Sequence, residues 1–187
     1  MSTRVVIPPS LEPITASMAK LHTRIDQNLE DSLIETWIRS GRVMAEGFQN
    51  RAYIERTLEL TLDHFPANIF NLPTPPLIEV ESIKYYDEDN NEYEIPNADY
   101  YVDTYSEPGR VALKSGASWP SVKLRPLNGV IVRYKSGYGP STDDTPDNVR
   151  DALLVYVTYR FYNREAEGDN PPPQFYWLLW PDRMVPA

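Results

Sequence analysis

The chain has 187 residues, enough for one domain with appendages, and 41% of them are hydrophobic, which is enough for a core. Its 27 acidic and 18 basic residues give a net charge of −9 without any basic run, which disfavours tight nucleic-acid binding. The absence of cysteine excludes disulfides, thiolate metal sites and cysteine nucleophiles. No stretch reaches the roughly 18 apolar residues of a membrane span. Residues 1–13 contain no apolar run of signal-peptide length, so we expect a protein made in a cytoplasm.

The N-terminal part of the chain predicts an extended arm followed by two helices. Residues 1–13 are punctuated by proline and predict the arm. Apolar residues at helical spacing predict a first helix over about 14–26, with Thr15 as its N-cap. A broad apolar stripe predicts a second helix over about 29–48. Asn28, with Asp31 three residues later, resembles a capping box at its start.

The hydrophobic period then changes from 3.6 to 2, which indicates strands. Alternation over 57–62 predicts a half-buried strand. It resumes at Leu77 and slips phase, which predicts a bulge at Glu81–Ser82. The turn at 89–91 predicts a hairpin. Further short strands are expected at 100–102, 111–113 and 130–134.

A third helix and a tail complete the chain. Thr145-Pro146-Asp147 supplies an N-cap, a proline at the first helical position and an acid, which predicts a helix over about 146–166 that ends by Gly168. The prolines at 171–173 favour an extended tail over 169–187. The element order predicts an α+β fold. We expect a small helical bundle of three main helices over 14–168, with an antiparallel β region inserted at about 55–135 and an extended C-terminal tail. We expect the second and third helices to pack together.

The sequence contains only incomplete catalytic and metal-binding motifs. Its two histidines, His22 and His64, lack the HExxH spacing of a zinc site. The acidic run 87–92 begins like an EF-hand loop, but Glu92 stands where the turn glycine belongs. Gly137-Tyr138-Gly139 lacks the third glycine of a dinucleotide-binding loop. We therefore predict no catalytic residue, cofactor or metal, although single sequences do not reveal scattered carboxylate pairs.

Three groups of segments, in this order and spacing, carry a family resemblance. The first is ITASMAKLHTRID at 14–26, the amphipathic second helix, and NRAYI at 50–54; the second is 57–66 with 72–87; the third is 100–103, 137–139 and 146–164. Together they resemble the head–tail connector (adaptor or head-completion) proteins of tailed bacteriophages. The match covers most of residues 14–165, and the ending LLWPDR at 178–183 is also similar to endings in that family.

This resemblance implies a structural virion protein and not an enzyme. The family forms a ring, usually of twelve copies, beneath the portal protein, and holds a stopper, tail tube or tail nozzle on its other side. Genomic DNA passes through the channel without sequence-specific binding. The implied location is the capsid–tail junction of the virion, after assembly in the cytoplasm of a host bacterium. The resemblance assigns no functional residue to this sequence.

The apolar tail is the sharpest candidate for docking to the portal or a neighbouring copy. The residues are Phe175, Tyr176, Trp177, Leu178, Leu179 and Trp180, and the alternative is that they pack on the chain's own core. Two loops are expected to face neighbouring subunits or partners, and they contain Asp87, Glu88, Asp89 and Asn90, and Gly137, Tyr138 and Gly139. A carbohydrate- or protein-binding accessory module is the rival function. It needs Tyr85, Tyr93 and Tyr101 coplanar on one sheet face, although cross-strand packing is their commoner use.

Overall fold

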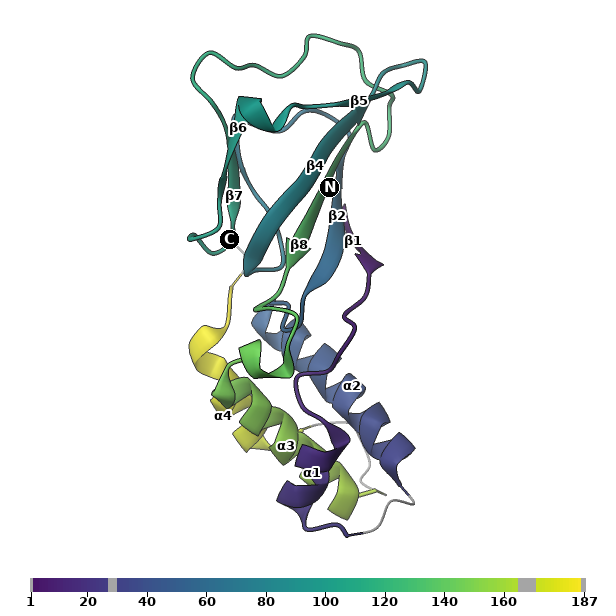
Figure 1. Cartoon of the computed structure of the whole chain (residues 1–187), viewed down its shortest axis with the longest axis vertical. Coiled ribbons are helices and arrows are strands. Elements are labelled where there is room, and N and C mark those ends of the chain that lie inside the picture. Colours follow the sequence, from purple (N-terminus) through teal and green to yellow (C-terminus); the bar gives the residue numbers. More distant parts are fainter. Residues whose placement is uncertain (1, 27–29, 165–170, 186–187) are drawn as a thin grey trace. The chain divides into compact units, whose positions relative to one another are not determined.

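The computed structural model describes residues 2–26, 30–164 and 171–185, which form two compact units (Figure 1). The β unit is Met1–Pro8 with Glu55–Gly137, and the helical unit is Pro9–Ile54 with Tyr138–Ala187. Most of the β unit is therefore inserted between the second and third helices, as the change in hydrophobic period predicts. The α+β class is confirmed.

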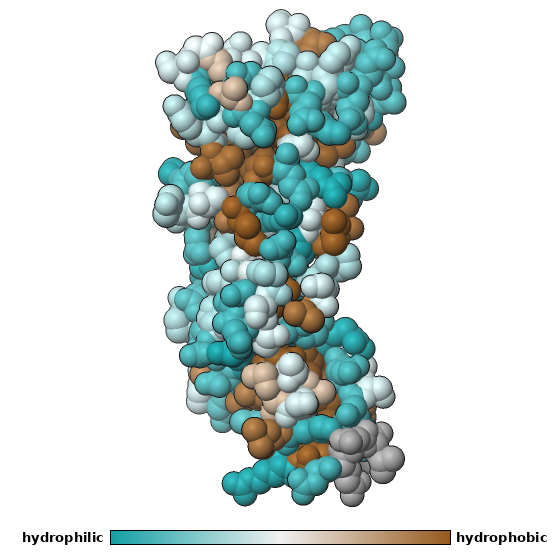
Figure 2. Space-filling model, viewed as in Figure 1, coloured by the Kyte–Doolittle hydropathy of each residue, from teal (hydrophilic) through white to brown (hydrophobic). Residues whose placement is uncertain are grey.

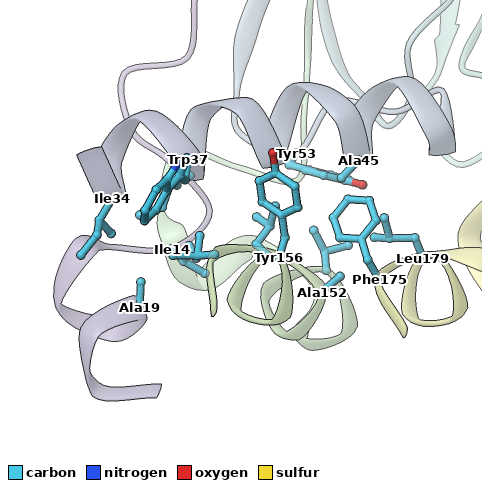
Figure 3. Packing of buried hydrophobic residues seen from close by; sticks show 14 residues of the cluster. Ile14, Ala19, Ile34, Trp37, Ala45, Tyr53, Ala152, Tyr156, Phe175 and Leu179 are labelled. Atoms are coloured by element: carbon cyan, nitrogen blue, oxygen red, sulfur yellow. The ribbon is translucent and has the colours of Figure 1, made fainter. Parts of the chain in front are cut away.

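The helical unit packs four α-helices around one core. They are α1 (Ala16–Thr23), α2 (Asp31–Gln49), α3 (Asp147–Tyr162) and α4 (Pro173–Leu179), with the short 3₁₀ helices η2 (Thr142–Asp144) and η3 (Trp180–Asp182) before α3 and after α4. The core side chains come from all four helices and include Trp37, Tyr156 and Phe175. Figure 3 shows α2 on one side of these side chains and α3 and α4 on the other. The expected packing of the second helix on the third is confirmed.

The starts of the helices agree only partly with the predicted caps. Thr15 caps α1, because its Oγ1 accepts a hydrogen bond from the Met18 amide at 3.2 Å. The predicted cap at Thr145 is wrong: α3 begins after Pro146, and the Thr145 hydroxyl has no hydrogen-bond partner among the described residues. Ser141 forms a capping box one helix earlier, at η2. The other predicted signals, Asn28 and Gly168, lie outside the described residues.

The β unit consists of two antiparallel sheets. The five-stranded sheet has the order β1-β2-β8-β4-β5, with β1 (Ser2–Ile7), β2 (Arg56–Leu62), β8 (Val130–Ser136), β4 (Leu77–Tyr86) and β5 (Glu92–Glu94). The three-stranded sheet has the order β3-β7-β6, with β3 (Ile69–Asn71), β7 (Arg110–Leu113) and β6 (Tyr100–Asp103), the last preceded by the 3₁₀ helix η1 (Asn97–Asp99). Both sheets supply side chains to a second apolar core, which includes Leu60, Ile83 and Val111.

The bulge and the hairpin predicted from the sequence are both present. Val80 on β4 lies opposite Tyr134 on β8, and Ser82 lies opposite Arg133. The intervening Glu81 therefore has no residue opposite it in the strand pairing. That extra residue explains the phase slip in the apolar alternation. The β4–β5 hairpin turns through Asn90, whose φ of 66° is tolerated by asparagine.

Of the two segments predicted to be extended, the arm is mostly a strand and the tail is mostly helical. Most of the N-terminal arm is the edge strand β1, which pairs with β2 from Ser2 to Ile7. The tail is not extended, because residues 173–179 form α4. Pro173 occupies the first helical position, where a missing amide costs nothing, and the four-residue spacing of Phe175 and Leu179 puts both side chains in the core.

Candidate assembly surface

The C-terminal segment is fixed to the helical unit by a set of polar contacts. The buried Gln49 side chain donates to the Leu179 carbonyl at 2.5 Å, and Arg51 Nε donates to the Asp182 carbonyl at 2.6 Å. From α3, Asn148 Nδ2 donates to the Leu178 carbonyl at 3.0 Å. The bonds to Leu178 and Leu179 satisfy carbonyl groups at the end of α4, which would otherwise lack intrahelical partners, and the bond to Asp182 holds η3. The tail is therefore part of the folded unit.

The six apolar tail residues divide into a buried set and an exposed set. Phe175 and Leu179 are fully buried in the core, whereas Tyr176 and Leu178 are half-buried and pack against it. Trp177 and Trp180 remain 70% and 64% exposed. Self-packing thus accounts for Phe175 and Leu179, and of the six residues the two tryptophans are the most exposed to a partner.

Trp180 and Trp177 differ in how they are held. The Trp180 ring lies 6.0 Å from the Phe48 ring, and the Arg183 guanidinium lies 5.4 Å from the Trp180 ring centroid and 4.7 Å from that of Phe48. Arg183 Nε also donates to the Phe48 carbonyl at 3.1 Å. Trp177 makes no ring or cation–π contact within the described part of the chain. Its side chain is a free apolar projection on a helix that is otherwise anchored.

The outer face of α2 carries a shallow groove, which we call the α2 groove. It is lined by Thr36, Arg39, Ser40, Val43 and Met44, and its volume is about 550 Å³. Val43 is 61% exposed although it is apolar. Arg39 donates to the Thr36 hydroxyl at 3.3 Å and pairs with no carboxylate among the described residues. Exposed apolar side chains also lie among hydrophilic ones elsewhere on the surface (Figure 2).

The start of α3 presents carboxylates to solvent. Asp143 and Asp147 both pair with Arg150, the former at 3.3 Å. Asp151, one turn after Asp147, is exposed and forms no hydrogen bond or ion pair with the described residues. These three carboxylates thus stand against the single positive charge of Arg150, and this face of the helical unit is acidic.

The acidic loop predicted to face a partner is an ordered hairpin turn. The Asp87 carboxylate accepts hydrogen bonds from the Asn91 amide at 2.9 Å and the Asp89 amide at 3.0 Å, and the bonds from Asn91 are the main reason that its pKa is lowered. Glu88 pairs with Lys123 at 2.6 Å, and Asn90 accepts from Arg125 at 2.8 Å. Asp89 and its neighbours 88 and 90 are exposed, so this loop stays a candidate for contact.

The second predicted loop does not present an exposed surface. Gly137 and Gly139 are buried and Tyr138 is half-buried. The Gly137 amide donates to the Pro76 carbonyl at 3.0 Å, and the Tyr138 amide donates to the Tyr53 carbonyl at 3.0 Å. A Cβ at Gly139 would collide with the Asp144 carboxylate. These glycines therefore permit close packing of the chain, and only Tyr138 of this loop segment keeps part of its surface exposed to a partner.

The tyrosines required by the rival function do not share one platform. Tyr85 and Tyr93 lie opposite each other on β4 and β5 and stack at 5.2 Å, whereas Tyr101 belongs to the three-stranded sheet, with Lys114 above its ring. Sequence reasoning missed the more exposed Tyr105, which is 97% exposed in the β6–β7 loop. The Asp103 carboxylate orders that loop by accepting from the Tyr105 amide at 3.0 Å and the Ser106 hydroxyl at 2.7 Å. An Asx turn of this kind is the signal that the sequence offers.

The described residues contain no group of three or more His, Cys, Asp or Glu side chains placed to hold a metal ion. Among the same residues, no helix combines the length and apolar character needed to cross a bilayer.

Comparison with known proteins finds similarity at the level of structure. No family model matches the chain, and no curated protein matches its sequence. A chain in the neck of an empty gene transfer agent (GTA) particle, computed with C6 symmetry, superposes with a TM-score of 0.84 at 18% identity. Chains from the virion of the native particle and from its neck, computed with C12 symmetry, give TM-scores of 0.82 and 0.76, also at 18% identity. Each match covers 100% of this chain and 97% of the other, so the protein has the fold of these neck chains over its whole length.

Proposed function

We propose that this protein is a structural neck subunit of a phage-like particle, a head–tail connector that joins the capsid to the tail. The observation that carries the proposal is the full-length fold likeness to GTA neck chains, at a TM-score of 0.84 over 100% of this chain. The likeness includes both units and the tail, so it does not rest on one common supersecondary motif. The resemblance of the sequence segments to phage connectors points in the same direction.

The proposed assembly is a ring, with twelve copies as the expected number. The related necks were computed with sixfold and twelvefold symmetry, and a ring of twelve satisfies both. In such a ring each subunit presents two different faces to its neighbours, which is what cyclic symmetry with more than two copies requires. The proposed partners are the portal protein on one side and a stopper, tube or nozzle on the other.

The charge of the chain supports passage of DNA through the ring and not capture of DNA by it. A net charge of −9 repels phosphate, and an acidic wall lets a polyanion slide without adhering. The proposed location is the capsid–tail junction of the virion, after assembly in the host cytoplasm. The role is mechanical, and no step of it needs catalysis or a cofactor.

Docking through the tail remains part of the proposal, but it now involves fewer than the six residues expected from the sequence. Of the six apolar residues at 175–180, Trp177 and Trp180 are the most available to the portal or to a neighbouring copy, because Phe175 and Leu179 fill the core. Deletion of residues 171–187 is consequently a poor test, since it removes core side chains together with the exposed tryptophans. Single substitutions of exposed residues separate docking from folding.

The test mixes the purified protein with its cognate portal protein and images the mixture by negative-stain electron microscopy. We expect rings stacked on portals, with twelvefold or sixfold class averages. Trp177→Ala and Trp180→Ala are compared with Leu21→Ala, which changes an even more exposed apolar side chain on α1. Portals left bare by the folded wild-type chain would refute the proposal, and binding on a glycan array without any assembly would favour the accessory-module alternative.

A further inference from the structure

The helical unit carries two surfaces that are complementary in shape and charge. We propose that the α2 groove of one copy receives Trp177 of a second copy, while Arg39 faces the acidic start of that copy's α3. This contact is the subunit–subunit interface of the ring, and it rests on the proposed function. The acceptor surface is the α2 groove, and the donor surface consists of Trp177, Asp147 and Asp151.

The two surfaces lie on different helices of one compact unit. Gly41 is the point where α2 meets α3, because a Cβ there would lie 2.7 Å from Tyr156 Cδ1 and 3.2 Å from Leu153 Cδ2. Thr36, Arg39 and Val43 of the groove are exposed, whereas Ser40 Oγ lies 3.4 Å from Tyr156 Oη and Met44 packs against the core. On α3, Asp151 lies about half a turn away from Leu153 and Tyr156 at 100° per residue. The exposed part of the acceptor surface thus belongs to α2, and the donor surface belongs to α3 and α4.

The groove has the shape and chemistry to accept an indole ring. Val43 and Met44 supply apolar walls, and its volume of about 550 Å³ falls in the range of sites that hold ligand-sized groups. Arg39 has no carboxylate partner among the described residues, so its guanidinium is available to stack on an aromatic face. Trp177 is the matching projection: it is 70% exposed, and the helix that carries it is held in place by Gln49 and Asn148.

Charge complementarity selects a second copy as the occupant. Asn148 Nδ2 bonds to the Leu178 carbonyl and, at 2.9 Å, to Asp182, which places the end of α4 beside the first turns of α3. Asp151 follows Asn148 by one turn, so Trp177 and the unpaired carboxylate belong to the same face. Docking of this face on the α2 groove brings Asp151 toward Arg39, and both charges lack an ion-pair partner in the described part of the monomer. Electrostatic matching of this kind gives specificity and register.

The contact is heterologous, because the groove and the projection are different patches of one chain. Each copy therefore offers one groove and one tryptophan. However many copies are added, the open oligomer still has one unused groove at one end and one unused tryptophan at the other. Such contacts continue until the rotation closes into a ring. A dimer with twofold symmetry would instead use both pairs at once and stop.

The first experiment mixes two variants that are each defective on one side. Val43→Asp removes the groove, and Trp177→Ala removes the projection; both side chains are exposed in the monomer, so both variants should fold. We expect the wild-type chain to self-associate in sedimentation velocity over a concentration series up to its solubility. Each variant alone should associate at least about 30-fold more weakly, the loss typical of a central interface residue. A one-to-one mixture should form dimers and nothing larger, since only one intact groove–tryptophan pair exists per two chains.

The second experiment exchanges the charges. Arg39→Glu and Asp151→Arg should each weaken association, and the double variant should recover it, because the pair is then restored with reversed sign. Leu21→Asp is the matched control: it adds a charge at an exposed apolar position outside both surfaces. Circular dichroism verifies the fold of every variant.

The outcomes separate this interface from the proposed function. Wild-type chains that remain monomeric at the solubility limit, or a double variant that does not recover, would overturn the interface. Rings formed on portals by Val43→Asp would also overturn it, while leaving the connector role intact. Bare portals with the wild-type chain would instead refute the connector role itself.

Discussion

Two glycines on α2 provide a matched test of how closely α2 and α3 pack. Gly41 faces α3, where an added Cβ would lie 2.7 Å from Tyr156 Cδ1. Gly47 lies less than two turns later on the exposed side, where a Cβ would meet nothing within 4 Å. Both are interior to the helix Asp31–Gln49, so alanine brings a similar gain in helix propensity at each.

The two substitutions should change the free energy of unfolding in opposite directions. Gly47→Ala should raise the free energy of unfolding by about 0.5–1 kcal/mol, because alanine loses less backbone entropy in a helix than glycine. At Gly41 the same gain is opposed by overpacking, which costs about 1–3 kcal/mol when side chains in a dense core must shift. Tyr156 is fully buried beside Phe175 and cannot move into solvent. Gly41→Ala should therefore be less stable than the wild type by about 1 kcal/mol.

The two variants should thus differ by about 2 kcal/mol, roughly 30-fold in the folding equilibrium. Urea unfolding measures this as a shift of the midpoint at constant slope. Hydrogen exchange in α2 and α3 should localise the effect to the helical unit. Equal stabilities for the two variants, or a stabilised Gly41→Ala, would show that α2 and α3 are not packed as described.

Two further substitutions probe charged contacts. Arg42 is buried and bonds to Glu12 at 2.6 Å and Glu46 at 2.9 Å, so Arg42→Ala removes the cation that these two carboxylates share and should cost about 3 kcal/mol in urea unfolding. A loss under about 1 kcal/mol contradicts this. Hydrogen bonds from Ser106 and then Arg110 lower the pKa of Asp103. Its stabilising contribution is therefore complete above the pKa of an unfolded aspartate, about 3.9, and is lost as pH falls toward the lower folded value. Asp103→Asn should unfold with a shallower pH dependence below pH 4, and an unchanged dependence would refute the role of Asp103.

Local patterns predicted the elements whose signals are contained in a few adjacent residues. The phase slip around Glu81 located the bulge, and Thr15 located the start of α1. The pairing of β1 with β2 could not be read in the same way, because it joins residues about 55 positions apart. The prolines at 171–173 misled the tail prediction, since Pro173 is also a favourable first residue of a helix.

The candidate surface was less predictable than the fold, because exposure is decided by packing between elements. Trp177 and Phe175 belong to the same apolar run, yet one is an exposed projection and the other fills the core. The α2 groove left no motif in the sequence, since threonine, serine, valine and methionine are unremarkable on a helix. Gly137 and Gly139 looked like a flexible loop, but glycine also serves where backbone must approach other atoms closely.

The sequence suggested two alternatives for the tail: packing on its own core or docking to a partner. The structure makes them compatible. Phe175 and Leu179 anchor α4, and Gln49 and Asn148 hold its end, so the backbone under Trp177 is ordered before any partner arrives. Ordering a free tail at the moment of binding would reduce affinity, whereas a projection that is already fixed avoids most of that cost. Self-packing of one face of α4 is therefore what would make its other face an effective contact between subunits.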